Sequence, residues 1–134
     1  MGGTFIKIAA VYLAIGITLG IYMGITEEFE YTPLHAHLNL LGWATTGIFG
    51  LIYIAFPSVN GKLGKTHFWL HNIGAPLVLI GMILFINGQE GIAFPIALSG
   101  SLMVLGGTFV FMVNMFKNIK NGESGVRNKQ KLER

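Results

Sequence analysis

The stretch LHAHLNLLGWATTGIFGLIYIAFP, residues 34–57, decides how the chain folds, because it is a continuous apolar run with two histidines near its start. About 20 apolar residues in a helix cross the ~30 Å hydrocarbon core of a bilayer. Ionisable side chains inside such a span are rare, and they commonly bind ions, cofactors or substrates. The stretch therefore predicts a membrane-spanning helix with His35 and His37 as candidate functional residues.

Three further stretches have the same character, and the composition of the chain agrees with them. Of its 134 residues, 52% are hydrophobic and 11% are charged, and its mean hydropathy is +0.62. The four predicted spans cover residues 4–26, 34–56, 67–87 and 92–116. The expected fold class is all-α, an integral membrane four-helix bundle formed by residues 1–116 as one domain. Residues 117–134 are expected to form a mobile basic tail.

The positions of the charges predict the orientation of the bundle. Lys62 and Lys65 lie between the second and third spans, and six further basic residues follow the fourth span. Because basic residues prefer cytoplasmic loops, both termini are expected in the cytoplasm, with the bundle surrounded by lipid in the inner membrane. The other two connections contain only acidic charges. The basic tail is interpreted as an orientation signal, so no nucleic-acid partner is expected.

The ligand chemistry of the chain is limited, because it contains no cysteine. A metal ion would need histidine, methionine or oxygen ligands. His35 and His37 are about 200° apart around a helix axis and only ~3 Å apart along it. They therefore cannot easily hold one ion together, but they offer ligands to two different sites on opposite flanks of the same helix.

Small residues mark the faces where helices are expected to pack. Gly16, Gly20 and Gly24 recur every four residues, which lets another backbone approach closely. This packing is assigned to the monomer in preference to a subunit interface. A second small and polar stripe follows the His35 side of the second span, where it lines a helix interface or accommodates a flat ligand; its members are Asn39, Gly42, Thr46 and Gly50.

The third span carries a second histidine pair. His67 and His71 are one helical turn apart and face the same way, which is an acceptable spacing for a shared metal. His67 is expected at the membrane surface as an interfacial anchor, and His71 is retained as a candidate metal ligand. Tyr53, at the end of the second span, is expected in the inner belt of interfacial aromatic residues.

The residues from Leu34 to Met82 resemble a known family. The His-x-His at residues 35–37, the Phe-Gly-x-x-Tyr-x-x-Phe-Pro at residues 49–57 and the Lys-x-His-Phe-Trp at residues 65–69 are similar to the C-terminal four helices of subunit I of the heme-copper oxidases and the related nitric oxide reductases. By this resemblance, His35 is the proximal ligand of a high-spin heme and His37 an axial ligand of a low-spin heme. The resemblance implies heme b as the cofactor.

The chain is shorter than a subunit of that family, and this shapes the expected function. A full subunit has twelve spans in three four-helix arcs, and its copper ligands and other low-spin heme ligand lie on arcs that have no counterpart here. One copy therefore cannot assemble an oxygen-reducing dinuclear centre, and enzyme activity is left open. A homotrimer that rebuilds the ring is expected, with His35 of one subunit facing His37 of the next.

The expected function is a membrane heme protein for electron transfer or diatomic gas binding, with a respiratory-chain electron donor or acceptor as partner. Two alternatives stay open. The first is a copper or other transition-metal site at His35 and His37. Unlike heme, a bare metal ion carries no propionate groups, so it needs no basic residues to pair with them. The second is a structural or assembly subunit without a cofactor, in which both histidines only form hydrogen bonds near the lipid headgroups.

Overall fold

The computed structural model of the chain describes residues 1–119, and nearly all of them are helical. Four helices are long and apolar enough to cross a membrane: Gly2–Thr26, Phe29–Ala55, Lys62–Ile86 and Glu90–Asn118. No strand occurs within these 119 residues. The expected all-α fold with four candidate membrane spans is confirmed, whereas residues 120–134 of the predicted tail lie outside the described residues.

The second span is a composite of several helical types. It contains a short 3-10 turn, η1, two α-helices, and a π-helix, η2, of eight residues between them. Pro33 lies in the first turn of its first α-helix, where its missing N–H costs no helical hydrogen bond. In chain order the elements are α1 (Gly2–Thr26), η1 (Phe29–Tyr31), α2 (Thr32–His37), η2 (Leu38–Thr45), α3 (Thr46–Ala55), η3 (Pro57–Val59), α4 (Lys62–Ile86) and α5 (Glu90–Asn118).

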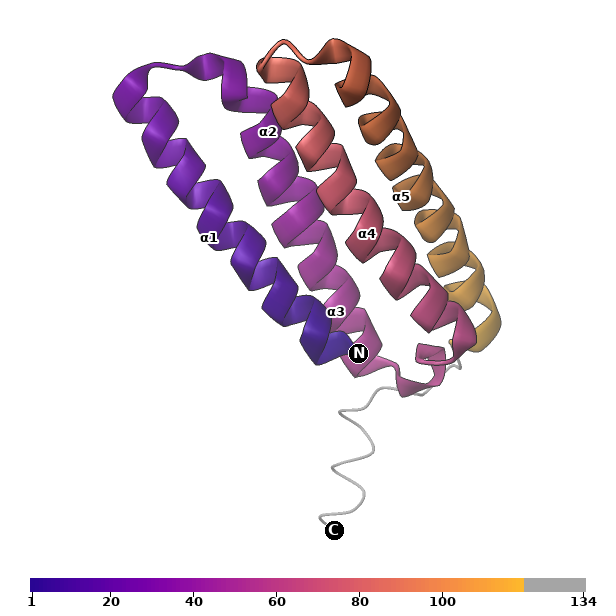
Figure 1. Ribbon diagram of the computed structural model, residues 1–134. Helices are drawn as coiled ribbons and strands as arrows, with labels where there is room; N and C mark the ends of the chain where they lie inside the picture. The colour runs from indigo at the N-terminus through magenta and orange to yellow at the C-terminus, as the bar shows by residue number, and fades with distance from the viewer. Residues whose placement is uncertain (120–134) are drawn as a thin grey trace.

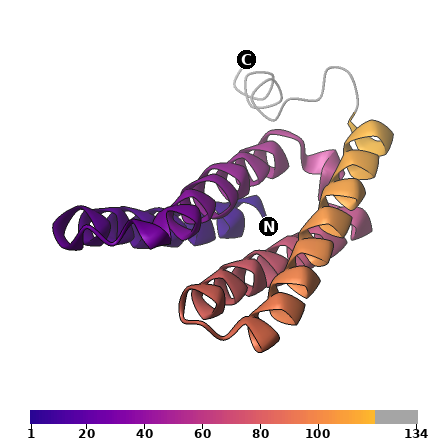
Figure 2. The ribbon, with the colours of Figure 1, turned by 90° about the horizontal axis from the view of Figure 1, so that it is seen from above.

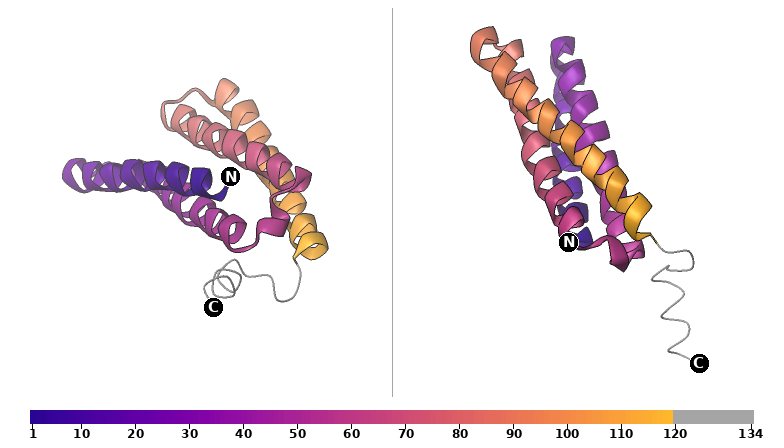
Figure 3. Two further views of the ribbon diagram at one scale, coloured as in Figure 1. Left: turned by 90° about the horizontal axis from the view of Figure 1, so that it is seen from below. Right: turned by 90° about the vertical axis from the view of Figure 1, so that its right-hand side faces the viewer.

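The four spans form two antiparallel hairpins. In Figure 1, α1 lies beside the α2–α3 span, and α4 lies beside α5. Met1, η3 and the end of α5 lie together at one end, here called the terminal end, and the two remaining connections lie at the other, here called the far end. Seen from above, the two hairpins diverge (Figure 2), and α5 runs obliquely past the second span (Figure 3).

Two apolar clusters hold the hairpins together. At the terminal end, Phe5 of α1 is fully buried against Phe49 and Tyr53 of α3 and Val59 of η3. Nearer the far end, Leu34 and Leu38 pack with Leu79 of α4. The remaining large apolar side chains of the spans are mostly exposed, as expected for helices that face lipid.

The helices begin earlier than hydropathy alone predicts. The third span starts at Lys62 and the second at Phe29, about one turn before the predicted starts at residues 67 and 34. Both termini of the described chain are at the end that carries Lys62 and Lys65, while Glu28 and Glu90 are at the far end. The charge asymmetry therefore runs along the bundle axis, and a cytoplasmic location for the terminal end stays a prediction.

Candidate functional site

The side chain of His35, a residue of α2, lies against α1, where a hydrogen bond holds its ring in one orientation. Its Nδ1 atom is 2.9 Å from the carbonyl oxygen of Gly16. Because a carbonyl only accepts, Nδ1 carries the proton and donates, so Nε2 of the neutral ring keeps its lone pair. The carbonyl oxygen of His35 in turn accepts a hydrogen bond from Nδ2 of Asn39 at 2.9 Å.

Gly20 makes the space for this ring. A Cβ atom at Gly20 would lie 2.8 Å from Cε1 and 3.3 Å from Nδ1 of His35, and one at Gly16 would lie 2.7 Å from Nδ2 of Asn39. The small-residue face of α1 thus packs within the monomer, as predicted, at two of its three glycines. Gly24 has no atom within 4 Å of the corresponding position.

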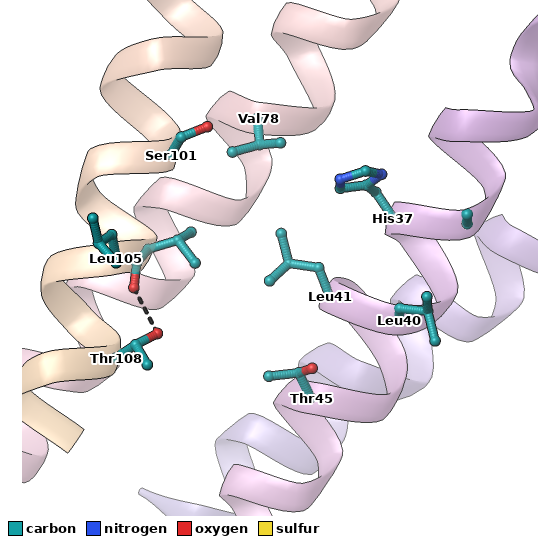
Figure 4. A pocket seen from close by; sticks show the side chains of 10 residues that line it. His37, Leu40, Leu41, Thr45, Val78, Ser101, Leu105 and Thr108 are labelled. Carbon is teal, nitrogen blue, oxygen red and sulfur yellow. Dashed lines mark hydrogen bonds between the residues drawn. The ribbon is translucent and has the colours of Figure 1, made fainter. Parts of the chain in front are cut away.

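His37 is fixed in the same way on the opposite flank of α2. Its Nδ1–H donates to the carbonyl oxygen of Pro33 at 2.9 Å, one turn back in the same helix, so its Nε2 lone pair is also free. The side chain is exposed, and Figure 4 shows its ring directed away from its helix toward Val78. The two histidines therefore face different neighbours, as their two-residue spacing predicts.

A groove of about 520 Å³ lies beside His37, between the two hairpins. This volume falls within the ~300–1,000 Å³ that small-molecule sites usually have. The lining is largely aliphatic, and Figure 4 shows that it comes from the second span on one side and from α4 and α5 on the other. We call it the His37 groove; its lining residues are Ala36, His37, Leu40, Leu41, Thr45, Val78, Ser101, Val104, Leu105 and Thr108.

Polar atoms that line the groove on the α5 side act as acceptors. Ser101 Oγ donates its only proton to the carbonyl oxygen of Ala97 at 2.8 Å, and Thr108 Oγ1 donates to that of Val104 at 2.9 Å. Each hydroxyl oxygen keeps lone pairs, as does Nε2 of His37. The groove wall therefore offers hydrogen-bond acceptors at these three atoms.

The π-helix η2 directly follows His37 and alters which residues face which helix. Gly42 faces Tyr12 of α1, and Gly50 faces Ile6 of α1, as the predicted stripe requires. Thr46 instead meets His71 of α4. A π-helix turns less per residue than an α-helix, which rotates the following positions, and π-helical segments are frequent at functional sites. No feature of the sequence pattern predicts this segment.

The expected interfacial positions of His67 and Tyr53 are wrong. His67 has an exposed fraction of 0% and Tyr53 one of 2%. Their side chains are hydrogen-bonded, with 2.9 Å between Tyr53 Oη and His67 Nδ1. Because α4 begins at Lys62, His67 lies inside the helix and faces the core, where Phe5 and Phe49 pack against it.

His71 is also buried, with an exposed fraction of 2%, and its ring centroid lies 5.9 Å from that of His67. The pair thus faces the same way, as predicted. Its Nε2 atom is 2.8 Å from Thr46 Oγ1. Among residues 1–119, no group of three or more histidine, cysteine, aspartate or glutamate side chains is placed to hold a metal ion. A metal-binding role for His71 stays a prediction.

The close contact between Gly20 and His35 leads to a specific prediction. We expect Gly20→Ala to push the imidazole of His35 out of its position and to weaken its hydrogen bond to Gly16, at a cost of about 1–3 kcal/mol in unfolding free energy. The 15N chemical shifts of His35 in histidine-labelled protein report the change. Gly24→Ala on the same helix face is the control and should leave these shifts unchanged, because its added methyl group meets no atom.

Two pairs of histidines differ in their surroundings. His35 and His37 point to opposite flanks of one span, each with a free Nε2 lone pair, and the groove adjoins His37. His67 and His71 belong to the core. No protein-family model, curated protein or solved structure matches the chain.

Proposed function

We propose that the protein is a membrane heme-binding protein in which His35 and His37 are axial ligands, and that it serves electron transfer or the binding of a diatomic gas. One observation carries the proposal: each histidine donates Nδ1–H to a backbone carbonyl and keeps Nε2 free. Histidines that bind metals commonly use their second nitrogen in this way, which fixes the tautomer and the ring orientation. The resemblance to heme-copper oxidase subunit I supports the same assignment.

The chain's own residues determine what such a site does. Nε2 of His37 faces a groove lined by aliphatic side chains, which exclude water from one side of a bound heme. When bound through two imidazoles, the heme supplies one-electron redox chemistry, and it offers a free coordination position for a gas only where a single imidazole binds the iron. Each flank of α2 offers one imidazole, so a second axial ligand has to come from another subunit. A homotrimer in which His35 of one copy faces His37 of the next provides it, and native mass spectrometry tests this stoichiometry.

The decisive experiment is an absorption spectrum of the detergent-purified protein, oxidised and reduced, after heme-replete expression. We expect a Soret band that is lost in His35→Ala and also in His37→Ala, because both imidazoles bind one shared heme. His71→Gln is the matched control, because it removes a buried histidine that contributes no ligand to the proposed site, and it should keep the band. Loss of the band in this control would assign a ligand role to His71, and absence of the band in the parent protein would refute the proposal.

A copper site at the same histidines is the second candidate, and the charge at the far end favours it. Glu27, Glu28 and Glu30 lie in the connection before α2, and Glu90 begins α5. No lysine or arginine occurs between residues 8 and 61 to pair with heme propionates. Elemental analysis of the same sample separates the candidates, because copper without iron supports the second, and neither metal supports the structural or assembly role.

A further inference from the structure

An open groove of about 470 Å³ runs along α1 and reaches Tyr22, one turn before the helix ends at Thr26. We propose that this groove binds an acyl chain of a phospholipid, and that the aromatic and acidic residues at its far-end mouth bind the ammonium group of the same lipid, as in phosphatidylethanolamine. The lipid site uses neither His35 nor His37, so it stands whether or not a heme or metal binds there.

The groove, here called the α1 groove, has the surface chemistry of a site for a hydrocarbon chain. Its only hydroxyl apart from that of Tyr22 belongs to Thr18, whose Oγ1 donates its proton to the carbonyl oxygen of Ala14 at 2.8 Å. No donor of the threonine is therefore left unpaired in the groove. The lining residues all come from α1; they are Ala14, Ile15, Thr18, Leu19 and Tyr22.

The length and depth of the α1 groove fit one leaflet of a bilayer. Ala14 and Tyr22 are about 12 Å apart along the helix axis at ~1.5 Å per residue, and one leaflet contributes about half of the ~30 Å hydrocarbon core. Tyr22 lies in the last turn of α1, at the level where tyrosine commonly meets lipid headgroups. A lipid with its headgroup near Tyr22 therefore directs its acyl chain along the groove toward Ala14.

The mouth of the groove is built from two tyrosine rings and one carboxylate. The hydroxyl of Tyr22 donates to Oε2 of Glu28 at 2.6 Å. The ring centroids of Tyr22 and Tyr31 are 6.1 Å apart, and the ring planes meet at 80°. A carboxylate accepts several hydrogen bonds, so Glu28 can take another donor. Aromatic rings beside an acceptor of negative charge suit an ammonium group, which is attracted to both.

The charge around the mouth favours a cation. The connection after α1 contains Glu27, Glu28 and Glu30, and no lysine or arginine occurs between residues 8 and 61. The last turn of α1 has no basic residue, although the C-terminus of a helix attracts positive charge. The described lysines lie toward the terminal end (Figure 1); they are Lys7, Lys62, Lys65 and Lys117.

The headgroup of phosphatidylethanolamine matches this arrangement. Its ammonium group is separated from the phosphate by a short carbon linker, so it can meet Glu28 in the connection beyond α1 while the phosphate stays in the headgroup layer. Phosphatidylglycerol has the same phosphate but no ammonium group, and the glutamates repel its net negative charge. The site should therefore select between two lipids that have identical acyl chains.

Lipid titration of the full chain in detergent tests the site, with native mass spectrometry as the readout. We expect the first phosphatidylethanolamine to bind about fivefold or more tightly than phosphatidylglycerol with the same acyl chains, because it adds an ion pair and a cation–π contact. Glu28→Gln keeps the shape of the side chain, removes its charge and should reduce this preference to about twofold or less. Glu90→Gln is the matched control; it removes a charge from the other hairpin and should keep the preference.

A change in the groove tests the acyl-chain half of the site separately. Ala14 is exposed, so Ala14→Leu fills part of the groove without disturbing the core. It should weaken both lipids by about threefold or more and leave their ratio unchanged, because less of the chain is buried.

Several results would overturn the site. One is equal binding of the two lipids by the parent protein, a comparison that requires no variant to fold. Another is a preference that survives Glu28→Gln, or that Glu90→Gln removes equally, since either would assign it to general charge. Unchanged binding in Ala14→Leu would remove the groove from the site. Calcium bound stoichiometrically without any lipid preference, and lost in Glu28→Gln, would assign the mouth to a metal ion.

Discussion

Gly100→Val is expected to separate α4 from α5 and to destabilise the bundle strongly. A Cβ atom at Gly100 would lie 2.7 Å from the carbonyl oxygen of Gly74 and 2.7 Å from the backbone nitrogen of Val78. Backbone atoms in the middle of a helix cannot move aside without shifting the whole helix. Overpacking usually costs about 1–3 kcal/mol, and we expect this variant at or above the upper limit. Unfolding by SDS, followed by circular dichroism, measures the loss.

The control for this variant lies on the same helix. Gly106→Val adds the same side chain to α5, but no atom lies within 4 Å of a Cβ atom there. Its unfolding midpoint should stay close to that of the parent protein. An equal loss of stability in both variants would contradict close packing of α4 on α5 at Gly100 and would indicate a general effect of valine in this helix.

The sequence identifies the packing faces but cannot rank them. Its spacing predicts that the glycines of α1 contact another helix, and Gly20 does so, because close approach needs the absence of a side chain at the crossing point. Gly24 belongs to the same pattern, but no atom lies within 4 Å of a Cβ atom there. The difference depends on where two helices cross, and a single helix's pattern contains no information about its partner.

The sequence likewise predicts one part of the candidate site, the two flanks of the histidine pair, but not the groove. The angular separation of about 200° between His35 and His37 around the helix axis follows from helix geometry alone. The sequence therefore predicts that they lie on opposite flanks of the helix. The groove beside His37 is not, because α4 and α5, which form its second wall, are distant in sequence. The burial of His67 is missed for a different reason: hydropathy starts the span after residues 60–66, while the helix already begins at Lys62 and places His67 against the core.

His67→Ala is expected to cost about 3 kcal/mol or more in unfolding free energy. Removing a fully buried ring leaves a cavity among Phe5, Phe49 and Phe111, and cavities of this size carry a large penalty. The hydroxyl of Tyr53 also loses its histidine partner in the buried core and keeps only its hydrogen bond to the Asn114 side chain, which adds about 1–3 kcal/mol. SDS-induced unfolding of the detergent-purified protein measures the sum.

His37→Ala is the matched variant, and the contrast between the two separates a structural histidine from a site histidine. His37 is exposed, and within residues 1–119 its side chain hydrogen-bonds only to a carbonyl of its own helix, so its removal should change the unfolding free energy of the cofactor-free protein by no more than about 0.5 kcal/mol. The double variant His67→Ala, Tyr53→Phe removes the orphaned hydroxyl and should recover part of the loss. A small effect of His67→Ala, similar to that of His37→Ala, would contradict the buried position of His67 and return it to the membrane surface.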